Sequence, residues 1–570
     1  MKKIFKEPLF YLLFMLVISW LWLIPEKMNI SDIKLMYEDK TETVKLPLQT
    51  DMPDNTDFTI SFNLSVAKQK KHEYKAIPDD CIKKITVNDN EIQLDKVKGL
   101  CDGTEGAIID FTEYLNIGNN RIEFKINNKG GPAGLRLREK EKVGLKHFVF
   151  VIILLVCIFL LLQKFRFGFR ASFVVILGIV VRIILYSNTT AEDFNYDFGP
   201  HMMYINVIAQ EMRIPANNEC FVCYHPPLYY IISAPASYDF NVLRQIQMLF
   251  SFLTLSFGVA LIYRMLGKNM AAFLTSLLWV LWPSSVLSSA RIGNDIPFYF
   301  GSIFCIYFAC NWWHKQKNSY FILATLGAVL SVAFKSTGFV ILGVWAIIYI
   351  CGAFKNLKIG SLKVLIASFV MVLLFLGISQ YKFITNIIEH KKVSFVGNTG
   401  GLPDGLRVKN EPGNYIYFDI KDFLTEPYVN PWGDEGGRQY FWNYSLKTSL
   451  FGEFRAWDTP IGKVFASLIS LFALVLIILS LWGILHSNIK EFPLLLFLLS
   501  LFAALMFARI QYPYSCTNDF RYIMPVILPI SYFSLKGVQI LTFKRLQVLG
   551  YVSIMLFAAL SFAFIIGRAI

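Results

Sequence analysis

The sequence predicts a polytopic α-helical membrane protein with one exported β-sandwich domain. The first observation is composition, because 55% of the 570 residues are hydrophobic and only 17% are charged, which is far from a soluble globular average. The second is a series of long apolar runs, and the third is a segment of alternating apolar and polar residues between the first two runs. Together they predict a bundle of membrane helices and a separate β domain.

The apolar runs define about thirteen predicted membrane spans of roughly 17 to 25 residues each. A run of this length is enough for an α-helix to cross the hydrocarbon core of a bilayer. The runs are 8–24, 146–163, 171–187, 243–263, 270–287, 296–312, 320–334, 337–354, 362–380, 461–485, 493–508, 522–535 and 547–567.

The lysines and arginines predict the orientation of these spans, because short cytoplasmic loops carry the positive excess. Lys2, Lys3 and Lys6 place the N-terminus in the cytoplasm, and alternate crossings then put the other basic loops on the same side. We therefore predict a bacterial inner-membrane protein whose functional face is periplasmic. Topology and contact with anionic lipids explain the net charge of +14, so we expect no nucleic-acid partner.

The predicted domains are a first membrane helix at 1–25, a periplasmic β-sandwich at 26–145, and a membrane domain at 146–570 with exported loops at 188–242 and 381–459. Within the sandwich, the alternating runs FTISFNLSV, KKITVNDNEIQL, AIIDF and NRIEFKI predict strands. Asp89-Asn90 and Gly118-Asn119-Asn120 predict turns between them. These phrases, with GGPAGLRL, resemble the galactose-binding-like jelly-roll domains that accompany many carbohydrate-active enzymes, which implies either sugar contact or a role as a spacer.

Four cysteines fall in the predicted exported parts: Cys81 and Cys101 in the sandwich, and Cys220 and Cys223 in the second loop. An oxidising compartment favours disulfides for each pair. A zinc site from Cys220, Cys223 and His225 is the alternative, although a single Cys-x-x-Cys is a weak signal.

The exported loop at 188–242 combines acids, histidines and prolines between two apolar runs. The spacing of apolar residues in 200–213 predicts a short amphipathic helix on the membrane surface, and 225–237 predicts a second one, too short to span. Asp197 precedes the first helix and His225 begins the second.

Asp197, the phrase HPPLYY (225–230) and four further motifs resemble the membrane glycosyltransferases of the GT-C fold, in the branch of the protein O-mannosyltransferases and the lipid A aminoarabinose transferase. The motifs are SSARIGND (288–295), FKSTGF (334–339), YSLKTSLFGEF (444–454) and FRYIMPVILP (520–529), and they recur in order over most of residues 146–540. Many relatives carry a paired Asp-Glu where this chain has Asp197-Phe198, and the inserted sandwich is not a general family feature.

The resemblance implies transfer of a sugar from a polyprenyl-phosphate-linked donor to an acceptor, with inversion at the anomeric carbon. Such a reaction needs a carboxylate to take the acceptor's proton and cations to hold the leaving phosphate. We predict Asp197 as the general base, with a pKa raised by partial desolvation, and Asp193 as the runner-up. The predicted contacts for donor phosphate and substrate are His201, His225, Tyr229, Arg291, Asn294, Asp295, Lys335, Arg521 and Tyr522.

The sequence predicts no specific cofactor. A divalent metal ion is left open, since Glu192, Asp193, Asp197 and His201 could assemble a site. The expected partners are the lipid-linked donor, a glycan, lipid or protein acceptor, and membrane lipids, and the expected state is a monomer. Alternatives are an oligosaccharide ligase with a pyrophosphate-linked donor and a lipid or sugar transporter; a transporter should show internal repeats and mid-span charges, which we do not find.

Overall fold

The computed structural model describes residues 29–44, 46, 48–53, 55–67, 71–78, 80–101, 106–129, 132–139, 145–164, 167–191, 193–195, 197–237, 239–354, 362–380, 404–433 and 437–569. The predicted first span, 8–24, lies outside these residues. The chain divides into two compact units, Met1–Leu161 and Leu162–Ile570.

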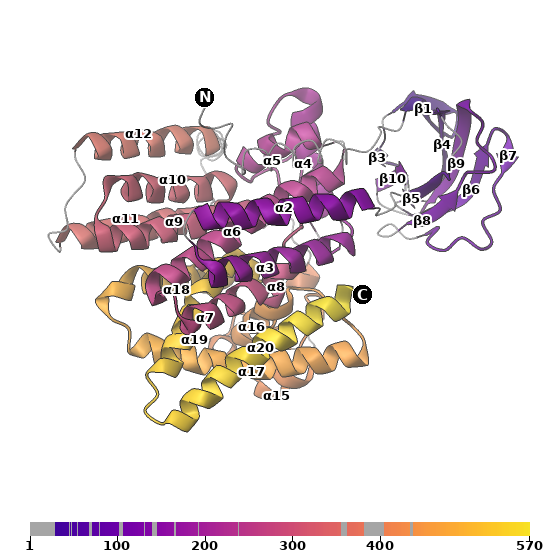
Figure 1. The fold of residues 1–570 in the computed structure, drawn as a ribbon. Helices are drawn as coiled ribbons and strands as arrows, with labels where there is room; N and C mark the ends of the chain where they lie inside the picture. Colours follow the sequence, from indigo (N-terminus) through magenta and orange to yellow (C-terminus); the bar gives the residue numbers. More distant parts are fainter. Residues whose placement is uncertain are drawn as a thin grey trace. The chain divides into compact units, whose positions relative to one another are not determined.

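The first unit contains two antiparallel sheets, drawn in indigo and violet in Figure 1. The larger has the strand order β2-β1-β4-β9-β6-β7 and the smaller β3-β10-β5-β8. The strands are β1 (Asn29–Tyr37), β2 (Lys40–Thr43), β3 (Leu48–Asp51), β4 (Thr56–Val66), β5 (Glu73–Pro78), β6 (Cys81–Val87), β7 (Asn90–Glu91), β8 (Ala107–Asp110), β9 (Gly118–Asn128) and β10 (Pro132–Glu139).

One hydrophobic core joins the inner faces of the two sheets. Phe58, Phe62 and Phe124 of the larger sheet share it with Tyr74 and Leu135 of the smaller one, and each is at most 2% exposed. These side chains alternate with outward-facing polar residues along each strand, so one face of each strand is buried and the other is polar. The arrangement is a β-sandwich.

Two turn predictions for this unit need correction. The hairpin between β6 and β7 turns at Asn88 and Asp89, which both have positive φ, rather than at Asp89-Asn90. Asparagine and aspartate tolerate that left-handed conformation better than most side chains. Gly118-Asn119-Asn120 is no turn either, because these residues begin β9 and pair with β4.

The second unit is helical. Its helices, with α2 crossing the boundary of the units, are α2 (Leu145–Lys164), α3 (Phe169–Ser187), α4 (Phe198–Glu211), α5 (Leu228–Ser233), η2 (Ala234–Ala236), α6 (Phe240–Leu266), α7 (Met270–Leu281), α8 (Pro283–Leu287), α9 (Asp295–Lys315), α10 (Asn318–Phe334), α11 (Gly338–Phe354), α12 (Leu362–Ser379), η4 (Asp404–Leu406), α14 (Gly413–Ile416), α15 (Ile420–Thr425), α16 (Phe441–Phe451), α17 (Pro460–Leu485), η5 (Ile489–Glu491), α18 (Phe492–Gln511), η6 (Ser515–Asn518), η7 (Phe520–Val526), α19 (Ile527–Gln539) and α20 (Lys544–Ala569).

Several helix ends follow from local sequence. Asp239 caps α6 by accepting a hydrogen bond from the amide of Asn241, and Thr459 caps α17, whose first residue is Pro460. The apolar run 270–287, predicted as one span, is two helices instead. Pro283 causes this break, because it pushes the preceding Trp282 into an extended conformation.

Five helices among the described residues are long and apolar enough to cross a membrane: Phe169–Ser187, Phe240–Leu266, Pro460–Leu485, Ile489–Gln511 and Lys544–Ala569. Shorter apolar helices, such as Met270–Leu281 and Asn318–Phe334, accompany them. The total of about thirteen spans stays a prediction.

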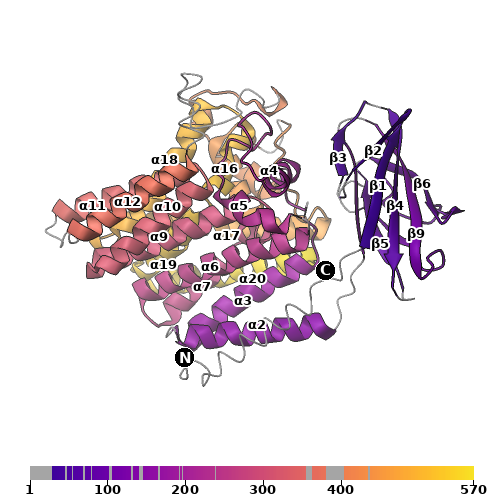
Figure 2. The ribbon, with the colours of Figure 1, turned by 90° about the horizontal axis from the view of Figure 1, so that it is seen from above.

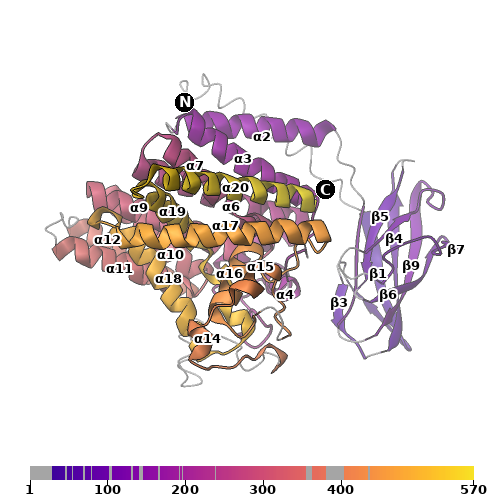
Figure 3. The ribbon, with the colours of Figure 1, turned by 90° about the horizontal axis from the view of Figure 1, so that it is seen from below.

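The long helices pack along one another, with α9, α10, α11 and α12 side by side in Figure 1. Glycines allow the closest contacts: a Cβ on Gly327 of α10 would lie 2.6 Å from the backbone nitrogen of Cys305 in α9. Figures 2 and 3 both show α4 and α16 on one side of these helices. That side carries the charged residues described next.

Candidate active site

Asp197 lies beside two arginines that come from distant parts of the chain. It directly precedes α4, and its Oδ2 accepts a hydrogen bond of 3.0 Å from Nη1 of Arg521 in η7. Nη2 of Arg291, between α8 and α9, is 3.5 Å from the same oxygen. The Asp197 side chain keeps 25% of its surface exposed, whereas Arg291 keeps 7%, so the carboxylate is the accessible part. Buried guanidinium groups thus flank a carboxylate that a substrate can reach.

Arg291 is held in place by Asn195 of the same loop as Asp197. Nε of Arg291 donates to Oδ1 of Asn195 at 3.1 Å, and Nδ2 of Asn195 donates to the carbonyl of Ile292 at 2.8 Å. Nη2 of Arg291 is buried and makes no hydrogen bond within the part of the chain that the structure describes. A buried guanidinium donor without such a bond is costly unless it serves a ligand, and phosphate oxygens suit it well.

Arg521 is held in place by a hydrogen bond to its backbone carbonyl and by contacts with Asp519. The hydroxyl of Tyr299 donates to the Arg521 carbonyl at 2.7 Å. Oδ1 of Asp519 accepts from the Arg521 amide, and its Oδ2 lies 3.0 Å from the Arg521 Nε. The guanidinium is therefore oriented before any substrate binds, which lowers the entropic cost of holding a phosphate.

Lys335 forms a buried ion pair with Asp295 nearby. Asp295 begins α9 and Lys335 follows the end of α10, so the packing of these two helices brings the charges together. The Lys335 ammonium lies 4.5 Å from the ring centre of Tyr522, and the Arg521 guanidinium lies 5.1 Å from it on the same ring. Tyr522 thus joins the two cations through contacts with its π system.

Asn294, a predicted substrate contact, directly precedes α9, which begins at Asp295. Its side chain makes no capping hydrogen bond. Instead, Nδ2 donates to the carbonyl of Phe334, the last residue of α10, at 3.1 Å. The Asn294 amide therefore bonds to the end of α10 rather than to the first turn of α9.

Both predicted histidines lie close to each other, with His201 buried and His225 partly buried. Nδ1 of His201 lies 3.0 Å from the Tyr230 hydroxyl, and the rings of His201 and His225 are 6.5 Å apart. Burial lowers the pKa of His201 to about 4, and burial and the charge of Lys335 hold the pKa of His225 well below its usual value. Near neutral pH the neutral ring of His225 is therefore favoured, so a contact of this residue with phosphate stays a prediction for a neutral hydrogen-bonding group.

The prediction of a raised pKa for Asp197 is also wrong. Burial does raise it, but the positive charges of Arg521 and Arg291 outweigh burial and hold the pKa of the Asp197 carboxyl at about 2. The two ion pairs depend on tertiary contacts, so reasoning from desolvation alone missed them.

Two predicted residues lie apart from these charges. Asp193 accepts a hydrogen bond from the Thr190 amide at 2.6 Å within its own turn. Tyr229 is buried in α5 and faces Ser233 and Gln247. The ion pairs thus distinguish Asp197 from its runner-up.

Both predicted cysteine pairs are disulfides, Cys81–Cys101 and Cys220–Cys223. The second bond uses the thiols that the zinc alternative required. Within the described ranges, which omit Glu192, no group of three or more His, Cys, Asp or Glu side chains could hold a metal ion.

No family model and no curated relative matches the chain. Among solved structures it is similar to the arabinosyltransferase EmbB from Mycobacterium smegmatis, at 9% identity and a TM-score of 0.34 over 85% of this chain and 42% of that one. The chain therefore spans less than half of that protein's length. It is also similar to ArnT from Cupriavidus metallidurans bound to undecaprenyl phosphate, at 13% identity and a TM-score of 0.31 over 64% of this chain and 76% of that one.

Three residues near the site were not predicted: Asn195, Asp519 and Glu453. Each stands in or beside a stretch that sequence reasoning singled out, namely the Asp197 loop, FRYIMPVILP and YSLKTSLFGEF. Glu453 is only 5% exposed, and the Tyr444 hydroxyl donates to its Oε1 at 2.5 Å. For Asp519 the available signal was an acid near the predicted cation Arg521, and for Glu453 it was an acid inside a motif. For Asn195 the only signal was its proximity to Asp197 in the sequence.

Proposed function

We propose that this chain is an inverting glycosyltransferase of the GT-C fold that uses a polyprenyl-phosphate-linked sugar at the outer face of the bacterial inner membrane. One observation carries the proposal: an accessible carboxylate, Asp197, lies within 3.0 Å of Arg521 and 3.5 Å of Arg291. A base next to two phosphate-binding groups is what displacement of a sugar from a phosphate requires. The order of the motifs in the sequence supports the same reaction.

In this mechanism the acceptor hydroxyl oxygen attacks the anomeric carbon from the side opposite the phosphate. The new carbon–oxygen bond forms as the bond from the anomeric carbon to the phosphate oxygen breaks. The bonding electrons leave with the polyprenyl phosphate, and Asp197 takes the hydroxyl proton. Arg521 and Arg291 stabilise the negative charge that grows on the leaving phosphate.

The low pKa of Asp197 fits this mechanism as a resting state. A carboxyl with a pKa of about 2 is a weak base, and the arginine charges are the reason that it stays ionised. A donor phosphate that binds the same guanidinium groups offsets their charge, which lets the pKa of Asp197 rise. The base would then be strengthened only when the donor is bound.

The test compares Asp197→Asn with the matched change Asp193→Asn. Asp193 lies four residues earlier in the same loop and accepts a hydrogen bond from the Thr190 amide. Mass spectrometry of cell-envelope glycans from a deletion strain first identifies the sugar and acceptor together. Purified variants are then assayed with that donor and acceptor. We expect Asp197→Asn to lower kcat by roughly 10²-fold or more, the contribution usual for general-base catalysis, and Asp193→Asn to retain activity.

Three outcomes would contradict parts of the proposal. Full transfer by Asp197→Asn removes the base assignment, and loss of transfer only in Asp193→Asn moves it to the runner-up. Faster turnover of a diphosphate-linked donor than of the monophosphate indicates an oligosaccharide ligase. Movement of labelled lipid in proteoliposomes without a covalent product indicates a transporter.

A further inference from the structure

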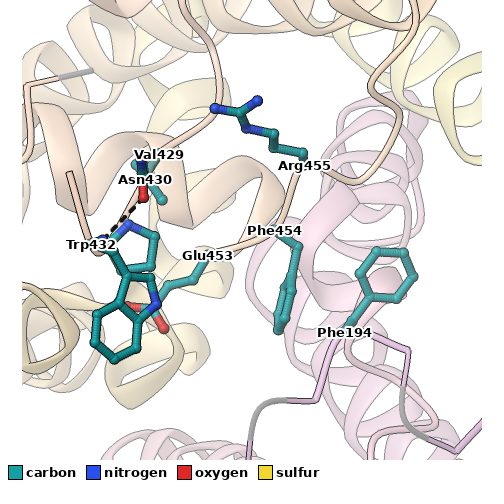
Figure 4. Close-up of a pocket in the computed structure, with 8 residues that line it drawn as sticks. Phe194, Val429, Asn430, Trp432, Glu453, Phe454 and Arg455 are labelled. Carbon is teal, nitrogen blue, oxygen red and sulfur yellow. Dashed lines mark hydrogen bonds between the residues drawn. The ribbon is translucent and has the colours of Figure 1, made fainter. Parts of the chain in front are cut away.

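A cavity of about 440 Å³ lies within the second unit (Figure 4). Two segments of the predicted exported loop 381–459 and the Asp197 loop line this cavity. The lining residues include Phe194, Asn430, Trp432, Glu453, Phe454 and Arg455. The cavity volume lies in the range of small-molecule sites, which is roughly 300 to 1,000 Å³. None of these six residues belongs to the predicted site.

The walls combine aromatic rings with hydrogen-bonding groups. The Phe194 and Phe454 rings meet edge to face at 5.5 Å, as Figure 4 shows, and Trp432 is 57% exposed. An exposed tryptophan loses hydrophobic stabilisation unless something covers it. Asn430 and Glu453 supply polar groups, and Asn430 already accepts a bond from the Trp432 amide at 3.0 Å.

This mixture suits a sugar ring. A pyranose has apolar C–H faces that pack on aromatic rings and a rim of hydroxyls that need hydrogen-bonding partners. Burial and the charge of Asp519 raise the pKa of Glu453 to about 8. At neutral pH the neutral acid therefore dominates, and its O–H can donate to a hydroxyl.

The cavity is next to the base. Phe194 lies three residues before Asp197 in the same loop, and the charges of Arg521 and Asp197 act on Glu453. Arg291, between α8 and α9, and Arg521, in η7, contact Asp197 and are not among the residues that line the cavity. An acceptor hydroxyl must reach Asp197, whereas the donor phosphate must reach the arginines.

We propose that the cavity between Phe194, Trp432 and Glu453 binds the sugar ring of a glycan acceptor and presents its hydroxyl to Asp197. Trp432 provides the stacking face, and Asn430 and Glu453 bind hydroxyls at the rim. The inference rests on the proposed function and narrows the acceptor class to carbohydrate.

The experiment uses the full chain in lipid nanodiscs free of glycosidic detergent. Saturation-transfer NMR measures binding of methyl glycosides of glucose, galactose, mannose and N-acetylglucosamine to the wild type, to Trp432→Ala and to Tyr417→Ala. Tyr417 is a matched control, because it is a half-exposed aromatic residue of the same exported segment that packs on Tyr440.

We expect at least one glycoside to bind the wild type and Tyr417→Ala, and to bind Trp432→Ala about tenfold more weakly or worse, as for an aromatic anchor. Glu453→Gln should keep binding near neutral pH, because the amide also donates a hydrogen bond. Failure of every glycoside to bind the wild type, or undiminished binding by Trp432→Ala, would overturn the inference.

A second probe separates this inference from the proposed function. Native mass spectrometry measures binding of undecaprenyl phosphate to the same variants, and we expect Trp432→Ala to bind it like the wild type. If undecaprenyl phosphate binds but no glycoside does, the assignment of the cavity to the acceptor is refuted and the proposed function is not. Displacement of the glycoside by undecaprenyl phosphate would assign the cavity to the donor and refute the acceptor role.

Discussion

Arg521 is the residue on which the candidate site depends most. It bonds Asp197 at 3.0 Å, lies beside Asp519 and stacks with Tyr522. The planar guanidinium has several donors in fixed directions, and a lysine ammonium would reach only one or two of these partners.

We expect Arg521→Lys to lower kcat of sugar transfer by at least about tenfold, because one charge remains but the bidentate geometry is lost. A steady-state assay with the identified donor measures this. Lys490→Arg is a control, since its side chain is exposed at the distant helix η5. Unchanged kcat in Arg521→Lys would mean that only the positive charge matters.

Glu453 should make the stability of the protein depend on pH. Its pKa is raised from 4.5 to about 8 by burial, so the folded protein keeps a proton that the unfolded chain releases. This contribution to stability is complete below pH 4.5 and is lost as pH rises through about 8.

Glu453→Gln cannot titrate and should lose this part of the pH dependence. We expect the fall in Tm between acidic and mildly alkaline pH to be smaller in Glu453→Gln than in the wild type. Burial also raises the pKa of Asp519, so this residue should account for the pH dependence that remains in Glu453→Gln. Thermal unfolding at several pH values measures it, and parallel curves for the two proteins would show that Glu453 is not the titrating group.

At the scale of elements, close helix contacts rest on glycine. A Cβ on Gly537 of α19 would lie 1.9 Å from the carbonyl oxygen of Leu479 in α17, so the two backbones touch. For Gly343 of α11, by contrast, no atom of the described residues outside its own helix backbone lies within 4 Å of the Cβ position. Sequence shows both as glycines in apolar helices, and only packing distinguishes them.

Gly537→Ala should destabilise the protein, because α17 and α19 must separate, at a cost of roughly 1 to 3 kcal/mol. Gly343→Ala fills open space and improves helix propensity, so it should be neutral or slightly stabilising. Thermal unfolding of the two variants in the same nanodiscs compares them. Equal Tm values would contradict the close contact.

At the scale of the whole molecule, the β unit has its own core. A contiguous set of buried side chains fills the space between its two sheets, and Cys81–Cys101 closes a loop of 20 residues within it. Burying this apolar surface and constraining the unfolded chain both stabilise the unit without help from the helices.

Residues 29–139, produced alone under oxidising conditions, should therefore fold. We expect a β-type circular dichroism spectrum and a cooperative unfolding transition, with Phe124→Ala costing about 3 to 5 kcal/mol. Lys125→Ala, the next residue on the exposed face of the same strand, is the control. A non-cooperative transition would mean that the unit needs the membrane domain.

The helical class, the β-rich segment and most of the charged residues near the site could be predicted from the sequence alone. This was possible because apolar length, alternation and residue chemistry are local properties. Arg291, Lys335, Arg521 and Asp197 were predicted from the motifs that resemble the GT-C glycosyltransferases, together with the predicted topology and the chemistry of their side chains.

Only the tertiary structure decided which of these charges meet. Asp197 pairs with Arg521, 324 residues away, and that contact reverses the direction expected for its pKa. The Asn294 side chain donates a hydrogen bond to the Phe334 carbonyl. The pKa of Glu453 is raised because tertiary packing buries its carboxyl group. The physical reason is that ion pairing and desolvation act over a few ångströms in space, and spacing along the chain does not fix those distances.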